Sequence, residues 1–144
     1  MSILVIVADG SRARFFSAVD KTAALIETTD LVNTGSRLRD QQLVTDGHGS
    51  GTDSVGRGKH TMGHEDDAHK HQASQFSRQL TDEIEKVRSA GTLRRIYIIA
   101  PPAFLGLIRS DLSKASGKLV EDTINKDLVN HDIADIRTHL PKLL

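Results

Sequence analysis

Four histidines and three acidic residues gather between residues 60 and 71. Imidazole and carboxylate groups together suit zinc, nickel or iron. His64-Glu65 begins the helical metalloprotease pattern, but Ala68 stands where that pattern needs its second histidine. One hypothesis is a metal-dependent hydrolase, and the competing one is a solvated polar segment. The candidate ligands of a divalent metal are His60, His64, His69 and His71.

A glycine-rich stretch precedes the histidines, with GHGSG at residues 47–51 and GRGK at 56–59. Glycine lets backbone N–H groups approach an anion, and neighbouring cations neutralise its charge. A Walker A loop would need glycine at Asp53 and serine or threonine at His60, so it is excluded. We predict contact with the phosphates of RNA, and the alternative is a mobile linker. The candidate phosphate-binding residues are Arg37, Arg39, Arg57, Gly58, Lys59 and His60.

Carboxylate, serine and thiol catalysis have little support. Asp9 closes the first apolar run, where a ribonuclease H-type nuclease keeps a metal ligand. The run that ends at Ala100 supplies no second acid, so the sequence favours a turn at Asp9-Gly10. Ser50 and Ser54 lack the strained turn that activates a nucleophilic serine. The chain has no cysteine. We predict no catalytic residue and no cofactor apart from the divalent metal of the alternative hypothesis.

Aliphatic and β-branched residues concentrate in five segments, which predict strands at residues 3–8, 13–19, 25–32, 94–100 and 119–125. The first segment is apolar throughout, as in a strand covered on both faces. An apolar period of 3.6 residues predicts a helix from residue 73 to Gly91, a natural stop. Two further helices are predicted, one after Pro101 and one from Asp132 to Leu140.

The order of these elements predicts an α/β fold: three strands, a long loop, then α-β-α-β-α. This order is typical of a mixed sheet in a three-layer arrangement, as in ribonuclease H-like proteins and the middle domain of peptide release factors. We expect a single domain over residues 1–144, with a flexible glycine- and histidine-rich insert at about residues 33–72. Long connections in compact domains usually bind, gate or react with something.

Charge and hydropathy set further bounds on function. Lys plus Arg and Asp plus Glu both number 19, so no global field steers the chain to nucleic acid or to an anionic membrane. A local basic patch is compatible with that balance. The longest apolar run, at residues 3–8, is too short for a signal peptide or a membrane span. We expect a cytoplasmic protein without membrane insertion, and no feature specifies its oligomeric state.

Five segments carry a resemblance to a known family: ADGSRAR at 8–14, DSVGRGKHTM at 53–62, APPAFLG at 100–106, KDL at 126–128 and HLP at 139–141. In this order they resemble the bacterial host attachment protein family, the proteins required for attachment to host cells. The chain departs from the family after Met62, where GHEDDAHKH replaces a proline-containing acidic stretch. The matching motif positions are Asp9, Gly10, Arg12, Arg14, Asp53, Ser54, Gly56, Met62, Pro101, Pro102, Phe104, Leu105 and Gly106.

The resemblance implies a role in bacterial attachment to a host, which would be indirect for a cytoplasmic protein. The family also looks like a distant relative of the release-factor middle domain, which implies contact with a ribosome or tRNA. Release factors use a Gly-Gly-Gln tripeptide to hydrolyse peptidyl-tRNA, and this sequence has none, so that activity is not carried over. The leading hypothesis is a non-enzymatic protein that binds RNA, a ribosome or a protein partner through its insert. The alternative is the metal-dependent hydrolase.

Overall fold

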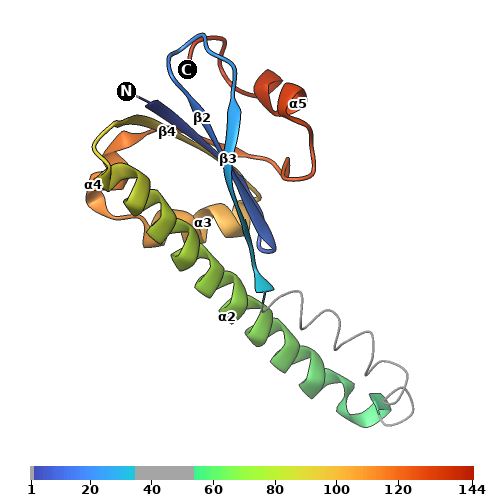
Figure 1. The fold of residues 1–144 in the computed structure, drawn as a ribbon. Coiled ribbons are helices and arrows are strands. Elements are labelled where there is room, and N and C mark those ends of the chain that lie inside the picture. Colours follow the sequence, from blue (N-terminus) through green and yellow to red (C-terminus); the bar gives the residue numbers. More distant parts are fainter. Residues whose placement is uncertain (1, 35–53) are drawn as a thin grey trace.

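A five-stranded mixed sheet forms the centre of the protein (Figure 1). The computed structural model describes residues 2–34 and 54–144, and for residues 54–67 it describes the backbone alone. The first three strands form an antiparallel meander, whereas β1, β4 and β5 pair in parallel. In the spatial order β3-β2-β1-β4-β5, the strands are β3 (Ile26–Val32), β2 (Arg12–Ala18), β1 (Ser2–Ala8), β4 (Leu93–Ala100) and β5 (Val120–Asn125).

Helices cover both faces of this sheet, as Figure 1 shows. Along the chain they are α2 (Ser54–Ser89), α3 (Pro102–Asp111), α4 (Lys114–Leu119) and α5 (Ile133–Thr138). The first three lie on one face, and α5 lies on the other with the C-terminal segment. The predicted α/β class with a mixed, three-layer arrangement is therefore confirmed. Within the described part of the chain, no helix is long and apolar enough to cross a membrane.

Each face of the sheet has its own apolar core, and β1 contributes to both. Its even-numbered residues from Leu4 to Ala8 pack with α2 and α3, and its odd-numbered residues from Ile3 to Val7 pack on the α5 side. Successive residues of a strand point to opposite faces, so a strand covered on both sides is apolar at every position. The aliphatic run at the start of the chain predicted such a strand, and the two cores confirm it.

α2 begins at Ser54, well before Ala73, where the apolar period of the sequence starts. Among its described side chains, the core residues Phe76, Leu80 and Ile84 belong to its second half. The first half extends beyond the sheet (Figure 1). The structure thus has a helix over residues 54–72, where the sequence predicted a loop. The remainder of the expected insert, residues 35–53, lies outside the described residues.

The cause of this difference is the way a helix grows. Once packing holds one end of a helix, each added residue gains a hydrogen bond without a new nucleation cost. Glycines such as Gly56, Gly58 and Gly63 cost roughly 1 kcal/mol each in a helix interior but do not have to end it. An apolar period in a sequence indicates the buried face of a helix, so it cannot detect a helical segment that has few apolar residues.

The ends of several helices follow the predicted signals, with one addition. Gly91 follows α2 with a φ of 86°, in the left-handed region that favours glycine. The Asp132 side chain caps α5 by accepting a hydrogen bond from the Asp135 amide at 2.8 Å. Two helices, rather than the one predicted, precede β5. Leu112 takes an extended conformation that ends α3, and Ser113 then caps α4.

The carboxylate of Glu85 joins α4 to α2. It accepts a hydrogen bond from Arg88 Nη2 at 2.6 Å and further ones from the hydroxyls of Ser113 and Ser116. These donors, Arg88 first, lower the pKa of Glu85 to about 2. Because Ser116 is fully buried, the network holds a side chain of α4 against α2.

Candidate functional site

Two motif segments meet where the chain leaves the parallel strands β1 and β4. From β1 the chain turns directly into β2, whereas from β4 it passes through α3 and α4 to β5 on the other side. Connections that diverge in this way from neighbouring parallel strands leave a crevice at their carboxyl ends, where α/β proteins usually bind ligands. The Asp9-Gly10 turn and the start of α3 at Pro102 lie at this point.

Asp9 forms the turn between β1 and β2. Its Oδ1 accepts hydrogen bonds from the amides of Ser11 at 2.8 Å and Arg12 at 2.9 Å. Its own amide donates to the Arg12 carbonyl at 2.9 Å. Among the described residues, no three His, Asp or Glu side chains form a group that could hold a metal ion. The geometry of Asp9 is that of a turn-forming residue, as the sequence favoured.

Asn33, at the end of β3, ties this turn to α2. Its Nδ2 donates to the carbonyls of Gly10 at 3.0 Å and Gln72 at 3.3 Å. Its backbone amide donates to the Ser11 carbonyl at 2.8 Å. Asn33 is only 8% exposed, so these bonds lie largely away from water. The sequence pattern did not mark Asn33, because one amide at the end of a strand carries no periodic signal.

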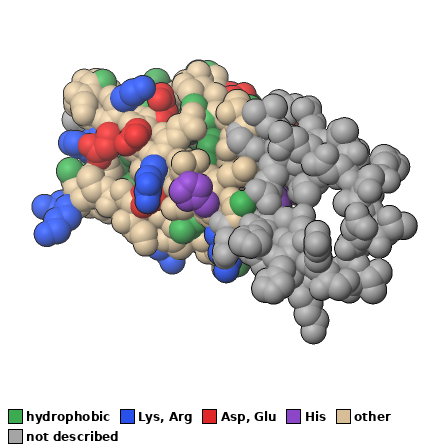
Figure 2. Space-filling model, turned by 90° about the horizontal axis from the view of Figure 1, so that it is seen from below, with side chains coloured by type: hydrophobic (Ala, Val, Ile, Leu, Met, Phe, Trp, Pro, Cys, Tyr) green, Lys and Arg blue, Asp and Glu red, His purple; other side chains and the backbone are tan. Residues whose placement is uncertain are grey.

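A cavity of about 510 Å³ lies between α2 and α3 beside the Asp9-Gly10 turn. Next to it, the rings of Phe76 and Phe104 stack with their centroids 5.9 Å apart. Figure 2 views the protein from this end, where apolar side chains lie beside a histidine. We call the cavity the α2–α3 cleft. It is lined by Gly10, His69, Lys70, Ala73, Pro101, Ala103, Phe104 and Leu107.

The cleft brings together residues that belong to different sequence patterns. Gly10, Pro101 and Phe104 are positions of the family motif, and His69 was a candidate metal ligand. Lys70 and Leu107 were not predicted from the sequence, and the apolar period of α3 was the one signal available for Leu107. The residues described as lining the cleft include no acid and no serine, threonine or cysteine. An apolar wall with one imidazole and one ammonium suits a ligand that joins apolar surface to negative charge.

The four candidate metal ligands all lie in α2, but the structure describes the side chains of only two. His69 lines the cleft, and His71 is exposed two positions further along. Residues two apart on a helix do not face each other, so this pair cannot share one ion from a single face. For His60 and His64 the structure describes the backbone alone.

The candidate phosphate-binding residues are placed only in part. Arg37 and Arg39 lie outside the described residues, as does Asp53 of the family motif. The segment from Arg57 to His60 lies in the first turns of α2, together with the motif positions Ser54 and Gly56. Met62 follows in the same helix.

The other motif positions near the cleft differ in how far they are buried and in what they contact. Leu105 is buried in the core between the sheet and α3. Pro102 is the exposed first residue of α3, and Gly106 has open space where a Cβ would lie. Arg12 lines a smaller neighbouring cavity of about 250 Å³ with Asp30 and other residues at the ends of β2 and β3.

Arg14 connects β2 and β3 to the C-terminal segment. Its Nε and Nη2 donate to the two carboxylate oxygens of Glu27 at 3.2 and 2.9 Å. Its Nη1 donates to the carbonyls of Val129, at 3.0 Å, and His131. The guanidinium lowers the pKa of Glu27 to about 2, and Glu27 in turn raises the pKa of the neighbouring Asp30. This motif position holds the fold together and lies outside the cleft.

Comparison with known proteins places the chain in a family. Residues 4–140 match the family described as "Protein required for attachment to host cells". The chain belongs to this family. The host-attachment resemblance of the sequence motifs is therefore confirmed over almost the whole chain. No curated protein matches the chain.

Two solved structures are similar to this member of the host-attachment family in fold. A crystal structure of an archaeal translation termination factor has a TM-score of 0.50 at 10% identity, covering 87% of this chain and 30% of the factor. The type II variant of the Aquifex aeolicus Ppx/GppA phosphatase has a TM-score of 0.45 at 15% identity, covering 87% of this chain and 36% of that one. The chain thus spans less than a third of the termination factor. At 10% identity, the similarity to the termination factor shows a release-factor-like fold and nothing further.

Proposed function

We propose that this host-attachment family member is a non-enzymatic, cytoplasmic protein that binds RNA on a ribosome or tRNA-like surface. The first turns of α2, with Arg57, Lys59 and His60, would contact phosphates, and Gly58 would allow close backbone approach. Arg37 and Arg39 precede this helix in the chain and would add two further cations. A contribution to host attachment would then be indirect.

The observation that carries this proposal is the extension of α2 beyond the sheet. A helix of 36 residues is about 54 Å long, and the core residues among the described side chains of α2 lie in its second half. Between Ser54 and Gln72 the apolar residues are Val55, Met62 and Ala68, too few for an apolar stripe. A helical segment without such a stripe gains little from packing on its own domain, which favours contact with an external partner.

The fold likeness adds support of a general kind. The similar archaeal protein is a translation termination factor, so a ribosomal setting is the natural one to test first. Without a Gly-Gly-Gln tripeptide in the sequence, the proposal does not include hydrolysis of peptidyl-tRNA. The metal-dependent hydrolase stays the alternative, since the side chains of His60, His64 and the three acids that follow lie outside the described ones.

Salt dependence tests the proposed phosphate contacts. If Arg37, Arg39, Arg57 and Lys59 each neutralise one phosphate, a fourfold rise in salt weakens binding by about 50- to 150-fold. Fluorescence anisotropy with a structured ribosomal RNA fragment measures this dependence. RNA binding that survives the fourfold rise unchanged contradicts the proposed phosphate contacts.

A pair of matched double variants tests whether RNA binds the extended half of α2. Arg57→Ala with Lys59→Ala removes two cations from the extended half of α2, and Arg78→Ala with Lys86→Ala removes two exposed ones from the packed half. The first variant should lower the slope of log K against log salt by about 1.4–1.8, and the second should leave it unchanged. Equal slopes for the two variants would overturn the proposed location.

A further inference from the structure

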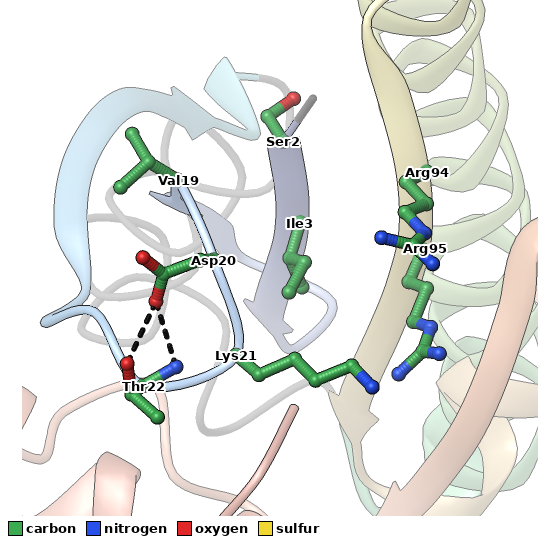
Figure 3. Close-up of a pocket in the computed structure, with 8 residues that line it drawn as sticks. All are labelled: Ser2, Ile3, Val19, Asp20, Lys21, Thr22, Arg94 and Arg95. Atoms are coloured by element: carbon green, nitrogen blue, oxygen red, sulfur yellow. Dashed lines mark hydrogen bonds between the residues drawn. The ribbon is translucent and has the colours of Figure 1, made fainter.

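A second cavity, of about 300 Å³, lies at the opposite end of the sheet, where β1 and β4 begin. Figure 3 shows Lys21 extending from the loop between β2 and β3 towards Arg95 of β4, with Arg94 beside it. Val19, which is 72% exposed, adds apolar surface, and Ile3 also lines the cavity but is only 4% exposed. We call this cavity the basic pocket. It is lined by Ser2, Ile3, Val19, Asp20, Lys21, Thr22, Arg94 and Arg95.

An irregularity in β4 explains why two consecutive arginines share one pocket. Ser2 pairs with Leu93 and Ile3 pairs with Arg95, so Arg94 has no partner in β1. In a regular strand, successive side chains point to opposite faces. A bulge interrupts this alternation and re-aims a side chain, and bulges are frequent beside binding sites. Here the bulge brings Arg94 and Arg95 to the same cavity.

The one acid of the basic pocket is engaged within its own turn. Asp20 Oδ1 accepts hydrogen bonds from the Thr22 amide at 2.8 Å, the Thr22 hydroxyl at 2.9 Å and the Ala23 amide at 2.8 Å. Led by the Thr22 amide, these donors lower the pKa of Asp20. Figure 3 shows its carboxylate turned towards Thr22 and away from the arginines. The carboxylate therefore stabilises the loop and does not separate the cations.

The three cations of the basic pocket, Lys21, Arg94 and Arg95, repel one another. Arg95 donates through Nη1 to the Leu144 carbonyl at 2.9 Å, which orients its guanidinium. Arg94 and Lys21 are exposed, and no hydrogen bond from either side chain to a described residue is present. Like charges held close repel one another, and an anion between them removes that repulsion. Guanidinium groups match the oxygens of a phosphate through paired hydrogen bonds, and lysine adds a point charge.

We infer that the basic pocket binds the terminal phosphate of a phosphomonoester through Lys21, Arg94 and Arg95. The organic part of the ligand rests on the exposed Val19, whose apolar surface has no role in holding phosphate. The site lies at the amino ends of the parallel strands, whereas the α2–α3 cleft lies at their carboxyl ends. It is therefore independent of the proposed RNA contacts of α2.

Amide NMR shifts during titration with inorganic phosphate, at constant ionic strength, test this site. Saturable shifts are expected at Lys21, Thr22 and Arg94. Arg94→Ala and Lys21→Ala should each weaken phosphate binding by about tenfold, as expected for one lost charge-assisted contact. Arg78→Ala removes an exposed arginine of α2 and is the matched control, which should bind phosphate like the wild type. Thermal unfolding of each variant confirms that it is folded.

The outcomes separate the site from general attraction of anions. Shifts that do not saturate, or equal losses in Arg94→Ala and Arg78→Ala, would overturn the phosphate site. AMP should bind more tightly than inorganic phosphate if the apolar wall contacts the rest of the ligand, and equal affinities would overturn that part. A 5′-phosphorylated RNA oligonucleotide compared with its 5′-hydroxyl form distinguishes an RNA end from a small phosphomonoester. Loss of RNA binding in the α2 variants would leave these results untouched.

Discussion

The substitution Arg14→Lys keeps a positive charge on β2 but removes the planar guanidinium that joins β3 to the C-terminal segment. Arg14 makes two hydrogen bonds to Glu27 and two to the carbonyls of Val129 and His131. Its side chain is only 11% exposed, and its guanidinium carbon lies 5.1 Å from the centre of the Phe16 ring. Lysine has a single ammonium group and cannot reach partners in these different directions at once.

The expected loss follows from these contacts. If lysine keeps two of the four hydrogen bonds, the two lost ones cost about 2–3 kcal/mol. Weaker contact with the Phe16 ring adds roughly 0.5–1 kcal/mol. The free energy of unfolding should therefore fall by about 2.5–4 kcal/mol, which lowers the melting temperature by about 5–15 °C in a domain of this size.

Urea denaturation followed by circular dichroism measures this loss. The matched control is Arg12→Lys on the same strand, because the Arg12 side chain donates no hydrogen bond to a described residue. The control should change the free energy of unfolding by about 0.5 kcal/mol or less. In a Glu27→Gln background, the cost of Arg14→Lys should shrink, since one of its partners is then neutral. The reasoning is refuted if Arg14→Lys destabilises the protein no more than Arg12→Lys does.

Three further substitutions test other parts of the structure. Glu85→Gln removes a carboxylate whose pKa is lowered to about 2, chiefly by Arg88. In the wild type, the stabilisation by this carboxylate is complete above the ordinary pKa of 4.5 and is lost as pH drops towards 2. The variant should show a flatter decline in urea denaturation between about pH 5 and pH 2, and equal slopes would contradict the network. Glu27 raises the pKa of Asp30, so the charged carboxylate of Asp30 slightly destabilises the fold at neutral pH. Asp30→Asn should therefore stabilise the protein at neutral pH by about 0.5 kcal/mol or less. The gain should disappear in acid, where Asp30 is protonated. Asn33→Ala should cost about 1–3 kcal/mol in the same assay, because it removes two largely buried hydrogen bonds to the carbonyls of Gly10 and Gln72. A neutral result would show that Asn33 does not hold α2.

The strands could be predicted because local sequence records their burial directly. The continuous run from Ile3 to Ala8 predicted a strand covered on both faces, and both cores contain its residues. Capping signals are equally local, so Asp132 and Gly91 marked helix ends correctly. The boundary of α2 escaped prediction because its first half lacks the apolar stripe that signals a helix.

The candidate site could be predicted only in fragments. Gly10 and Phe104 belong to motif segments about ninety residues apart, and nothing in either segment states that they line one cavity. Their meeting depends on the parallel pairing of β1 with β4, a long-range contact. Arg14 shows the converse, since it stands in the same motif as Gly10 but points to Glu27 and the C-terminal segment.

By itself, the sequence determined the α/β class, the strands, the family and the residue types available for binding, because these properties depend on local pattern and chain order. Only the tertiary structure decided which of those residues meet. The pairing of β1 with β4 forms the α2–α3 cleft from the turn at Gly10 and the start of α3, and the skipped position at Arg94 turns two neighbouring arginines towards Lys21. Such contacts join residues distant in the chain, and their geometry depends on strand register, which no short segment encodes.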